Sequence, residues 1–96
     1  MAFDDMTAFG AIRALAKAGL RVPENCSVVG FDDVAASSLY TPPLTTVRQP
    51  MEAMGAAAAS IVLEGINTVL EKREASAVHR KMAPELAVRE STRSLL

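Results

Sequence analysis

The run CSVVGF, residues Cys26–Phe31, constrains the fold more than any other part of the sequence. It is compact and β-prone, and it lacks the alternation of polar and apolar residues that marks a strand with one face in water. Strands that are buried on both faces have this pattern, and they occur in parallel sheets covered by helices. The run therefore predicts a central strand of an α/β fold.

Helical spacing and proline positions predict the other elements. Apolar residues recur at helical spacing after Asp4 and Asp5, either of which can cap a helix, and Gly19 ends that helix. Pro43 and Pro50 bound the short β-branched run LTTVR. In chain order we expect a helix over Asp5–Lys17, the strand Cys26–Phe31, a loop or short helix over Val34–Pro43, a strand over Leu44–Arg48, a helix from Met51 to about Arg73, a turn over Lys72–Ala77, strands over Val78–Met82 and Leu86–Glu90, and a frayed tail from Thr92.

The order of these elements predicts the fold class. Helices that alternate with short apolar strands indicate an α/β layer with a largely parallel sheet. The expected strands are few and short, however, and the chain opens with a helix that no strand precedes. The pattern is therefore typical of part of a larger fold.

Composition excludes several classes of protein. The 96 residues are enough for one domain, and a formal net charge of -1 argues against a surface that follows a nucleic-acid backbone. A single cysteine, Cys26, excludes an intrachain disulfide and a cysteine-based metal framework. The opening MAFDDMTAFG is acidic where a signal peptide is basic, and the weakly polar stretch Gly55–Leu63 is too short to span a bilayer. We therefore expect a cytoplasmic chain with no membrane span.

Two acidic pairs are the main candidates for chemistry. Asp32 and Asp33 follow the expected strand at its carboxyl end, where open α/β sheets bind ligands. A carboxylate at this place can bind a metal, act as a general base or accept hydrogen bonds from a polyol, but it can equally cap a helix or lie in a solvated loop. Asp4 and Asp5 offer the same choice, with capping favoured because a helix follows them directly.

The other reactive residue types lack a supporting motif. His79 is interpreted as a surface residue and Cys26 as a small buried hydrophobe. The sequence contains no nucleophile elbow, phosphate-binding loop or zinc ligand set, so no catalytic residue, metal or cofactor is expected. A hydrolase that uses Asp32 with Asp33 is a further alternative, and it would require turnover that disappears in Asp32→Asn. Tyr40, in a proline-containing loop, is either a lid over the core or an anchor in an interface.

Four segments occur together in one order and spacing: DDMTAFGAIRAL, GLRVPENCSVVGFDD, TPPLTTVRQPMEAMGAAAASIVLEGI and PELAVREST. Together they resemble the effector-binding domain of the LacI/GalR family of bacterial transcriptional regulators, over almost the whole chain. The combination of VPENCSVVGFDD with PPLTTVRQP is the most specific part of the match. The resemblance implies a partial periplasmic-binding-protein-like fold of type I, a three-layer α/β/α arrangement with a mostly parallel sheet.

The resemblance also implies a function and a division of the chain. Family members are sensors that hold a sugar or similar small molecule between two lobes and control operator binding by a dimer allosterically. Residues 1–96 would be the C-terminal portion of such a sensor, and the DNA-binding helix-turn-helix would lie outside them. Residues 4–48 and 86–90 would belong to the C-terminal lobe, residues 51–73 would form a crossover helix of the N-terminal lobe, and Gln49–Met51 would be a hinge.

Individual positions carry family roles by the same resemblance. Asp32 falls where family members place an aspartate that accepts hydrogen bonds from the effector's hydroxyl groups. Asp4 stands where many members have an asparagine that contacts the ligand, and Gln49 matches a polar residue beside the cleft. Phe9 and Tyr40 match positions that face the dimer partner.

Two alternatives to a regulator stay open. A solute-binding component of a sugar transporter shares the fold but requires an export signal upstream. An orphan truncated interaction domain is the other alternative. In either case, 96 residues alone should expose sheet edges and apolar helix faces, so we expect self-association.

Asp33 is expected to support its loop rather than to touch a ligand.

Overall fold

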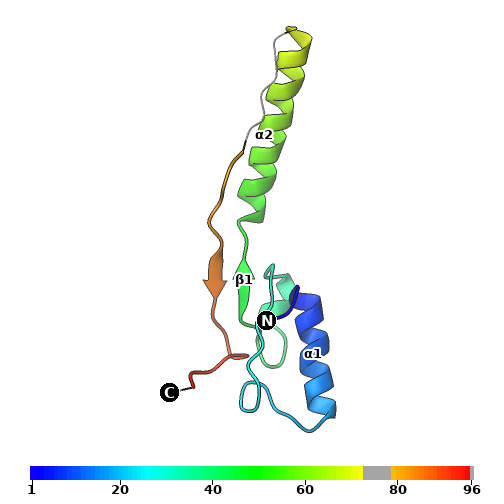
Figure 1. The fold of residues 1–96 in the computed structure, drawn as a ribbon, viewed down its shortest axis with the longest axis vertical. Coiled ribbons are helices and arrows are strands. Elements are labelled where there is room, and N and C mark those ends of the chain that lie inside the picture. The colour runs from blue at the N-terminus through cyan, green and yellow to red at the C-terminus, as the bar shows by residue number, and fades with distance from the viewer. Residues whose placement is uncertain (73–78, 96) are drawn as a thin grey trace. The chain divides into compact units, whose positions relative to one another are not determined.

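The computed structural model describes residues 1–72 and 79–95. The chain divides into two compact units, one formed by Met1–Gln49 with Pro84–Leu96 and the other by Pro50–Ala83. The first unit holds α1 (Asp5–Lys17), the 3-10 helix η1 (Ala35–Ser38), β1 (Thr46–Arg48) and β2 (Glu85–Ala87), and the second unit holds α2 (Met51–Leu70), as Figure 1 shows.

Helix α1 has the bounds that the sequence predicts. Asp4 caps it, because its Oδ1 accepts a hydrogen bond from the backbone N–H of Thr7 at 2.8 Å and satisfies a free amide of the first turn. At the other end Gly19 adopts a φ of 78°, the left-handed conformation that closes helices and that glycine adopts readily. Local signals in the sequence therefore account for both ends of this helix.

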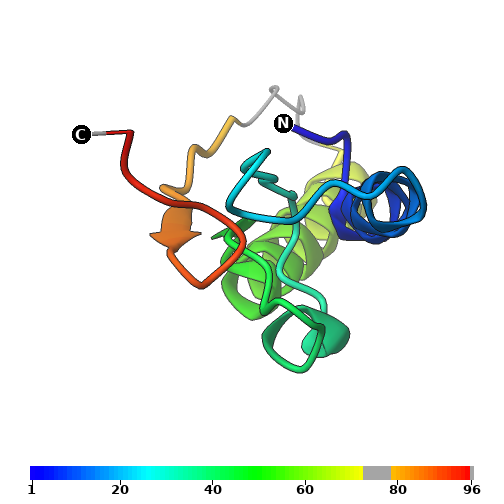
Figure 2. The same ribbon diagram turned by 90° about the horizontal axis from the view of Figure 1, so that it is seen from below.

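The core of the first unit is a small apolar cluster between α1 and two segments distant in sequence. Figure 2 shows α1 beside the coil that follows it along the chain. The buried members of the cluster are Ala8, Phe9, Ile12, Val28 and Leu44. The three that lie on α1 share one face of the helix, as helical spacing predicts.

The predicted strand Cys26–Phe31 is not a regular strand. Parallel pairing along this part of the chain is limited to two isolated bridges, at Val29 and at Asp32. On the other side, its partners are single backbone amides from the coil before α1 and from the first residue of α1. Neither side offers a continuous ladder, so the segment forms no regular strand. Cys26, which was expected to be buried, is exposed.

The sheet also differs from the expected one. The described strands, β1 and β2, form a two-stranded antiparallel sheet in which Thr46 lies opposite Ala87. Strand β1 begins later than the predicted strand Leu44–Arg48. The described residues therefore do not confirm a mostly parallel sheet or its three layers, because β2 pairs with β1 in the opposite chain direction.

The C-terminal strands are shorter than predicted. Strand β2 replaces the predicted strand Leu86–Glu90 and ends early, because the amides of Glu90 and Ser91 both turn to the carbonyl oxygen of Pro43. The predicted strand Val78–Met82 is wrong for residues 79–82, which form no strand, and its first residue lies outside the described part.

The tail beyond β2 is held rather than frayed. Ser91 is completely buried, and its Oγ donates to the carbonyl oxygen of Val28 at 2.6 Å and accepts from the amide of Thr45 at 2.8 Å. The Thr92 hydroxyl lies 2.9 Å from that of Thr45, and the Arg93 guanidinium donates to two backbone carbonyl oxygens of the turn after Val22. These hydrogen bonds join the tail to the core, which no local pattern in the tail could indicate.

Helix α2 is the only helix or strand in the described part of the second unit. It ends at Leu70, earlier than the predicted end near Arg73, and Lys72 in the following turn has a left-handed φ of 57°. Arg73 and most of the predicted turn Lys72–Ala77 lie outside the described residues. None of the helix's residues is buried, because no other described element of this unit packs against it.

Helix α2 is a longer apolar segment than the stretch Gly55–Leu63 indicated. An 18-residue window of this 20-residue helix has a mean hydropathy of 1.5, so by length and composition the helix could cross a membrane, which the stretch Gly55–Leu63 alone did not indicate. The expectation of no membrane span counted only an uninterrupted run, whereas Glu64 interrupts the apolar sequence without breaking the helix. The core helix of a soluble protein passes the same test, so this is weak evidence for a membrane span.

Candidate functional site

Asp32 and Asp33 occupy an unusual backbone turn in the first unit. Their φ angles are 114° and 59°, in a region that residues with a Cβ rarely adopt. The Asp32 amide donates to the carbonyl oxygen of Val47 at 2.9 Å, which ties the turn to β1. Strained conformations of this kind persist only where the surroundings hold them, and they cluster at binding and catalytic sites.

Asp32 and Gln49 are brought together by the fold. The Nε2 of Gln49, just after β1, donates to Oδ1 of Asp32 at 3.0 Å. Among the described residues no hydrogen bond reaches the other carboxyl oxygen of Asp32, and both side chains are only partly buried. A carboxyl group with one oxygen held by a hydrogen bond and the other without a protein donor is suited to accept hydrogen bonds from the hydroxyl groups of a ligand.

Asp33 pairs with two arginines, so its carboxyl group is not available to a ligand in the way that the Asp32 carboxyl group is. Its Oδ2 lies 2.7 Å from Nε of Arg48 on β1, and its Oδ1 lies 2.8 Å from Nη2 of Arg89 just after β2. Burial opposes ionisation of this carboxyl group, but the hydrogen bonds and charges of Arg48 and Arg89 outweigh it and lower the pKa of Asp33. The hydrogen bond from Arg48 to Asp33 in turn raises the pKa of the Arg48 guanidinium. Asp33 thus joins its turn to the two strands.

Asp4 lies near this turn but its carboxyl group serves the helix. The backbone hydrogen bond from Asp5 to the carbonyl oxygen of Phe31, at 3.0 Å, places the start of α1 beside the residue that precedes Asp32. Hydrogen bonding by Thr7 lowers the pKa of Asp4, and the backbone N–H of Thr7 contributes more to this than its side chain does. The structure therefore joins the residues next to Asp4 and Asp32 by a backbone hydrogen bond, and it gives the Asp4 carboxyl group the capping role that the sequence predicts.

Asp5 has a role that the sequence did not reveal. Its side chain is completely buried, and its carboxyl oxygens accept hydrogen bonds from the amide of Val34 at 2.8 Å and from the hydroxyls of Ser37 and Thr46 at 2.5 Å each. These hydrogen bonds join the first residue of α1 to the residues of η1 and β1. Only Gly30, whose missing side chain leaves room for this carboxyl group, is a partial signal in the sequence.

Phe9 and Tyr40 contact each other within the chain. Their rings stack with centroids 4.2 Å apart and planes at 10°, and the Tyr40 hydroxyl lies 3.4 Å from the carbonyl oxygen of Phe9. Phe9 is buried and Tyr40 partly exposed, so in this chain Tyr40 covers the edge of the core. Their place in a dimer interface stays a prediction.

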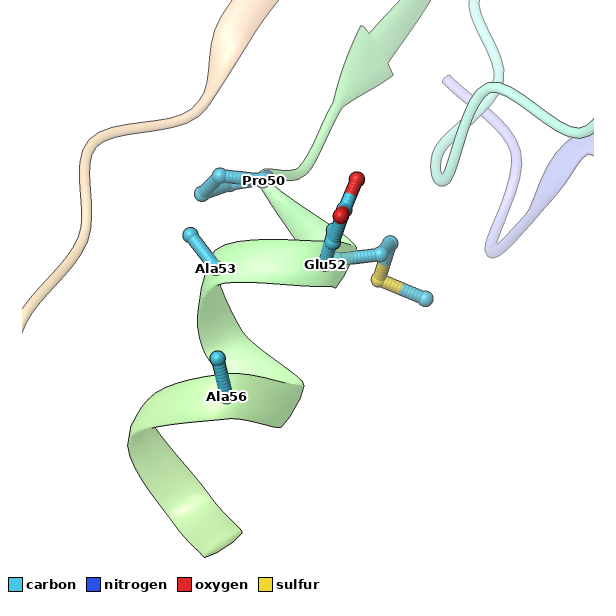
Figure 3. A pocket seen from close by; sticks show the side chains of 5 residues that line it. Pro50, Glu52, Ala53 and Ala56 are labelled. Atoms are coloured by element: carbon cyan, nitrogen blue, oxygen red, sulfur yellow. The ribbon is translucent and has the colours of Figure 1, made fainter. Parts of the chain in front are cut away.

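Other candidate residues gather at no site. His79 and Cys26 are exposed, and over residues 1–72 and 79–95 no group of histidine, cysteine and acidic side chains could hold a metal. A pocket in the second unit lies at the start of α2 (Figure 3). Its lining is mainly apolar and contains one charged side chain: Pro50, Met51, Glu52, Ala53 and Ala56. None of the residues singled out in the sequence for ligand contact lines it.

Comparison with known proteins gives one family. The family model for the periplasmic binding protein-like domain matches residues 1–92. The HTH-type transcriptional repressor PurR of Pasteurella multocida (strain Pm70) is 43% identical over 93 residues, which are 97% of this chain and 27% of the repressor. The chain thus spans about a quarter of the length of the curated relatives that it matches.

Solved structures agree with this comparison. The lac repressor dimer bound to operator and the anti-inducer ONPF is 34% identical, with a TM-score of 0.79 over 94% of this chain and 30% of the repressor chain. A LacI family transcriptional regulator from Lactobacillus casei with bound sucrose is 33% identical, with a TM-score of 0.75 over 95% of this chain and 32% of the regulator.

Proposed function

Because this chain belongs to the periplasmic binding protein-like domain family, and within it to the effector-binding domains of LacI-type regulators, we propose that it is the ligand-sensing and dimerisation part of a bacterial transcriptional repressor. Its relatives are repressors rather than enzymes, which indirectly supports a chain without catalytic residues. The names of these relatives favour a regulator over the solute-binding component of a transporter.

The effector is a sugar or a similar small molecule, and Asp32 is its main contact. The observation that carries this proposal is the Asp32 carboxyl group, which Gln49 holds through Oδ1 and whose other oxygen accepts no hydrogen bond from residues 1–72 and 79–95. Paired hydroxyl groups of a sugar are suitable donors to such a group. Gln49 contributes its remaining amide hydrogen and its carbonyl oxygen. Asp4 is a further polar contact of the ligand, which the hydrogen bond between the neighbouring residues Asp5 and Phe31 supports. Sucrose in the Lactobacillus casei regulator supports this ligand class.

The chain divides between the two lobes of the sensor. Residues 4–48 and 86–90 form part of the C-terminal lobe, and residues 51–73 form a crossover helix of the N-terminal lobe, with a hinge at Gln49–Met51. The division into two compact units, which falls between Gln49 and Pro50 and again before Pro84, supports this assignment. Proline at the first boundary fixes a backbone angle and removes a hydrogen-bond donor, as a hinge position tolerates.

The regulator acts in the cytoplasm as a homodimer with Phe9 and Tyr40 near its interface. The operator-bound lac repressor dimer supports this assembly. Operator DNA is bound through a helix-turn-helix outside these 96 residues. The effector favours one arrangement of the lobes and so changes the spacing of the DNA-binding parts, which is allosteric control. The formal net charge of -1 argues against a general attraction of this chain to DNA.

The proposal is tested by isothermal titration of the protein, as its gene encodes it, against a panel of sugars and nucleosides. We expect one sugar to bind and Asp32→Asn to weaken that binding about tenfold or more, since a carboxylate that accepts two hydroxyl groups contributes about 1.5 kcal/mol or more. Glu24→Gln, at an exposed turn, is the matched control and should bind like the unaltered protein. Equal affinity of the Asp32→Asn protein would overturn the site assignment.

A further inference from the structure

The ion pairs of Asp33 connect the turn at Asp32 to two separate segments of the first unit. Arg48 lies at the end of β1, shortly before the second unit begins at Pro50. Arg89 lies shortly after the chain returns to the first unit at Pro84. One carboxylate is thus held from the ends of two neighbouring strands, at 2.7 and 2.8 Å.

These contacts are well placed to fix the geometry of the turn. The Asp33 side chain is only 12% exposed, and its arginine partner Arg89 is 17% exposed, so their charges are poorly screened by solvent. Arg89 is itself anchored, since its Nη1 donates to the carbonyl oxygen of Leu44 at 2.9 Å. A second anchor is the backbone N–H of Arg89, which donates to the hydroxyl of Thr45 at 2.8 Å. The arginine therefore offers Asp33 a preorganised partner.

The turn needs such a partner because its conformation is unfavourable. Positive φ values at two successive aspartates cost free energy that the surroundings must offset. Charge-assisted hydrogen bonds are the strongest that an exposed or half-buried turn can make, and Asp33 makes two of them. The backbone angles of Asp32 in turn decide where its carboxyl group points and whether Gln49 can reach it.

We propose that Asp33 is a positioning residue for effector binding: held by Arg48 and Arg89, it maintains the turn that directs the Asp32 carboxyl group to the ligand, without touching the ligand itself. This inference rests on the proposed function, because it takes Asp32 as the ligand contact. It differs from a general structural role, since it requires the charge at position 33 and predicts an effect on the hydrogen bond between Asp32 and Gln49.

The first test measures binding of sucrose by titration calorimetry, with the protein as its gene encodes it. Asp33→Asn keeps the side chain's shape and removes its charge, and we expect it to weaken binding about tenfold. Arg89→Lys, which keeps the positive charge, should retain more affinity than Arg89→Gln. The matched control is Arg93→Gln, which removes an arginine that donates to the carbonyl oxygens of Pro23 and Glu24 and should not change the affinity.

The second test needs no ligand and reports on Asp32 directly. The side-chain amide signals of Gln49 in an NMR spectrum of the ligand-free protein should move, in Asp33→Asn, towards their positions in Asp32→Asn, whereas Arg93→Gln should leave them in place. Arg48→Gln, at a half-exposed arginine, provides the same readout if Asp33→Asn does not fold. Unmoved Gln49 signals in Asp33→Asn, or in Arg48→Gln when it is the readout, would overturn the inference.

The two tests separate this inference from the proposed function. If sucrose does not bind but the Gln49 signals move as expected, the positioning of Asp32 by Asp33 is supported and sucrose is excluded as the effector. If sucrose binds and Asp32→Asn weakens binding while Asp33→Asn does not, the proposed function is supported and the role of Asp33 is overturned.

Discussion

At the scale of single residues, the acidic pairs of this chain show what the sequence could and could not predict. Both pairs are candidates from the sequence, and Asp4 caps α1 as expected, whereas the segment before Asp32 is not the regular strand that was predicted. Their neighbours Asp5 and Asp33 have no local signature, because their partners Ser37, Thr46 and Arg89 lie far along the chain. Which aspartate of a pair is buried depends on those long-range contacts, and such contacts cannot be predicted from the residues next to the pair.

The buried carboxyl group of Asp5 predicts a large effect on stability. Asp5→Asn places an amide N–H₂ where three donors now converge, so at least one buried donor loses its acceptor. We expect a loss of about 3 kcal/mol in the free energy of unfolding, measured by urea denaturation. Asp4→Asn is the control, since asparagine also caps helices well and should change stability little. Equal stability of the two variants would contradict the role assigned to Asp5.

Asp33 predicts a specific dependence of stability on pH. Its pKa in the folded chain is lowered from the ordinary value of 3.8, so its contribution is complete above about that pH and is lost as the pH falls through the lower, folded-state pKa. The difference in unfolding free energy between the unaltered protein and Asp33→Asn should therefore be largest near neutral pH and shrink below pH 3.8. Urea denaturation at several pH values measures it, and a difference that grows towards acid pH would contradict the assignment.

At the scale of elements, α1 could be predicted to the residue, whereas the strands could not. The cap, the apolar spacing and the closing glycine of α1 all lie within or beside the helix. The segment Cys26–Phe31 instead depends on partners before α1 and around Thr45, which supply isolated hydrogen bonds rather than a ladder. The sequence pattern predicts a segment buried on both faces, whereas Cys26 and Ser27 are exposed and only Val28 and Gly30 are buried, because the pairing of the segment depends on the assembled unit.

Gly30 predicts how closely this segment packs against α1. A Cβ at this position would overlap Oδ1 of Asp5 and would lie 2.8 Å from Cδ2 of Leu44. We expect Gly30→Ala to destabilise the chain by about 2 kcal/mol, because neither neighbour can move without breaking core contacts. Gly10→Ala is the control: it lies on α1 with nothing near its Cβ position, and alanine there should stabilise the helix by up to about 1 kcal/mol. Thermal or urea denaturation of both variants measures the difference, and a neutral Gly30→Ala would contradict the packing.

At the scale of the whole molecule, the chain divides into two compact units, and their described parts differ in packing. The described first unit has its own small core, whereas α2 of the second unit has no buried residue. Resemblance over almost the whole sequence predicted this family, and the family model over residues 1–92 confirms it. The mostly parallel sheet was not confirmed, because the described strands pair antiparallel.

The exposed face of α2 predicts self-association of the isolated polypeptide 1–96. Val62, Ile66 and Val69 lie on one face at helical spacing, and each is at least half exposed. We expect the sedimentation coefficient to rise with protein concentration, and Ile66→Lys to reduce this rise by placing a charge in the centre of the face. Leu95→Lys, at an exposed residue of the tail, is the control. A monomer at every concentration would contradict the expectation.

The central claim, that Asp32 receives a sugar effector, is tested most directly by a crystal structure of the protein, as its gene encodes it, with the sugar that binds in titration. We predict hydroxyl groups of the sugar within hydrogen-bonding distance of the Asp32 carboxyl group, with Gln49 still donating to Oδ1. A sugar bound elsewhere, with the Asp32 carboxyl group facing solvent, would contradict the account.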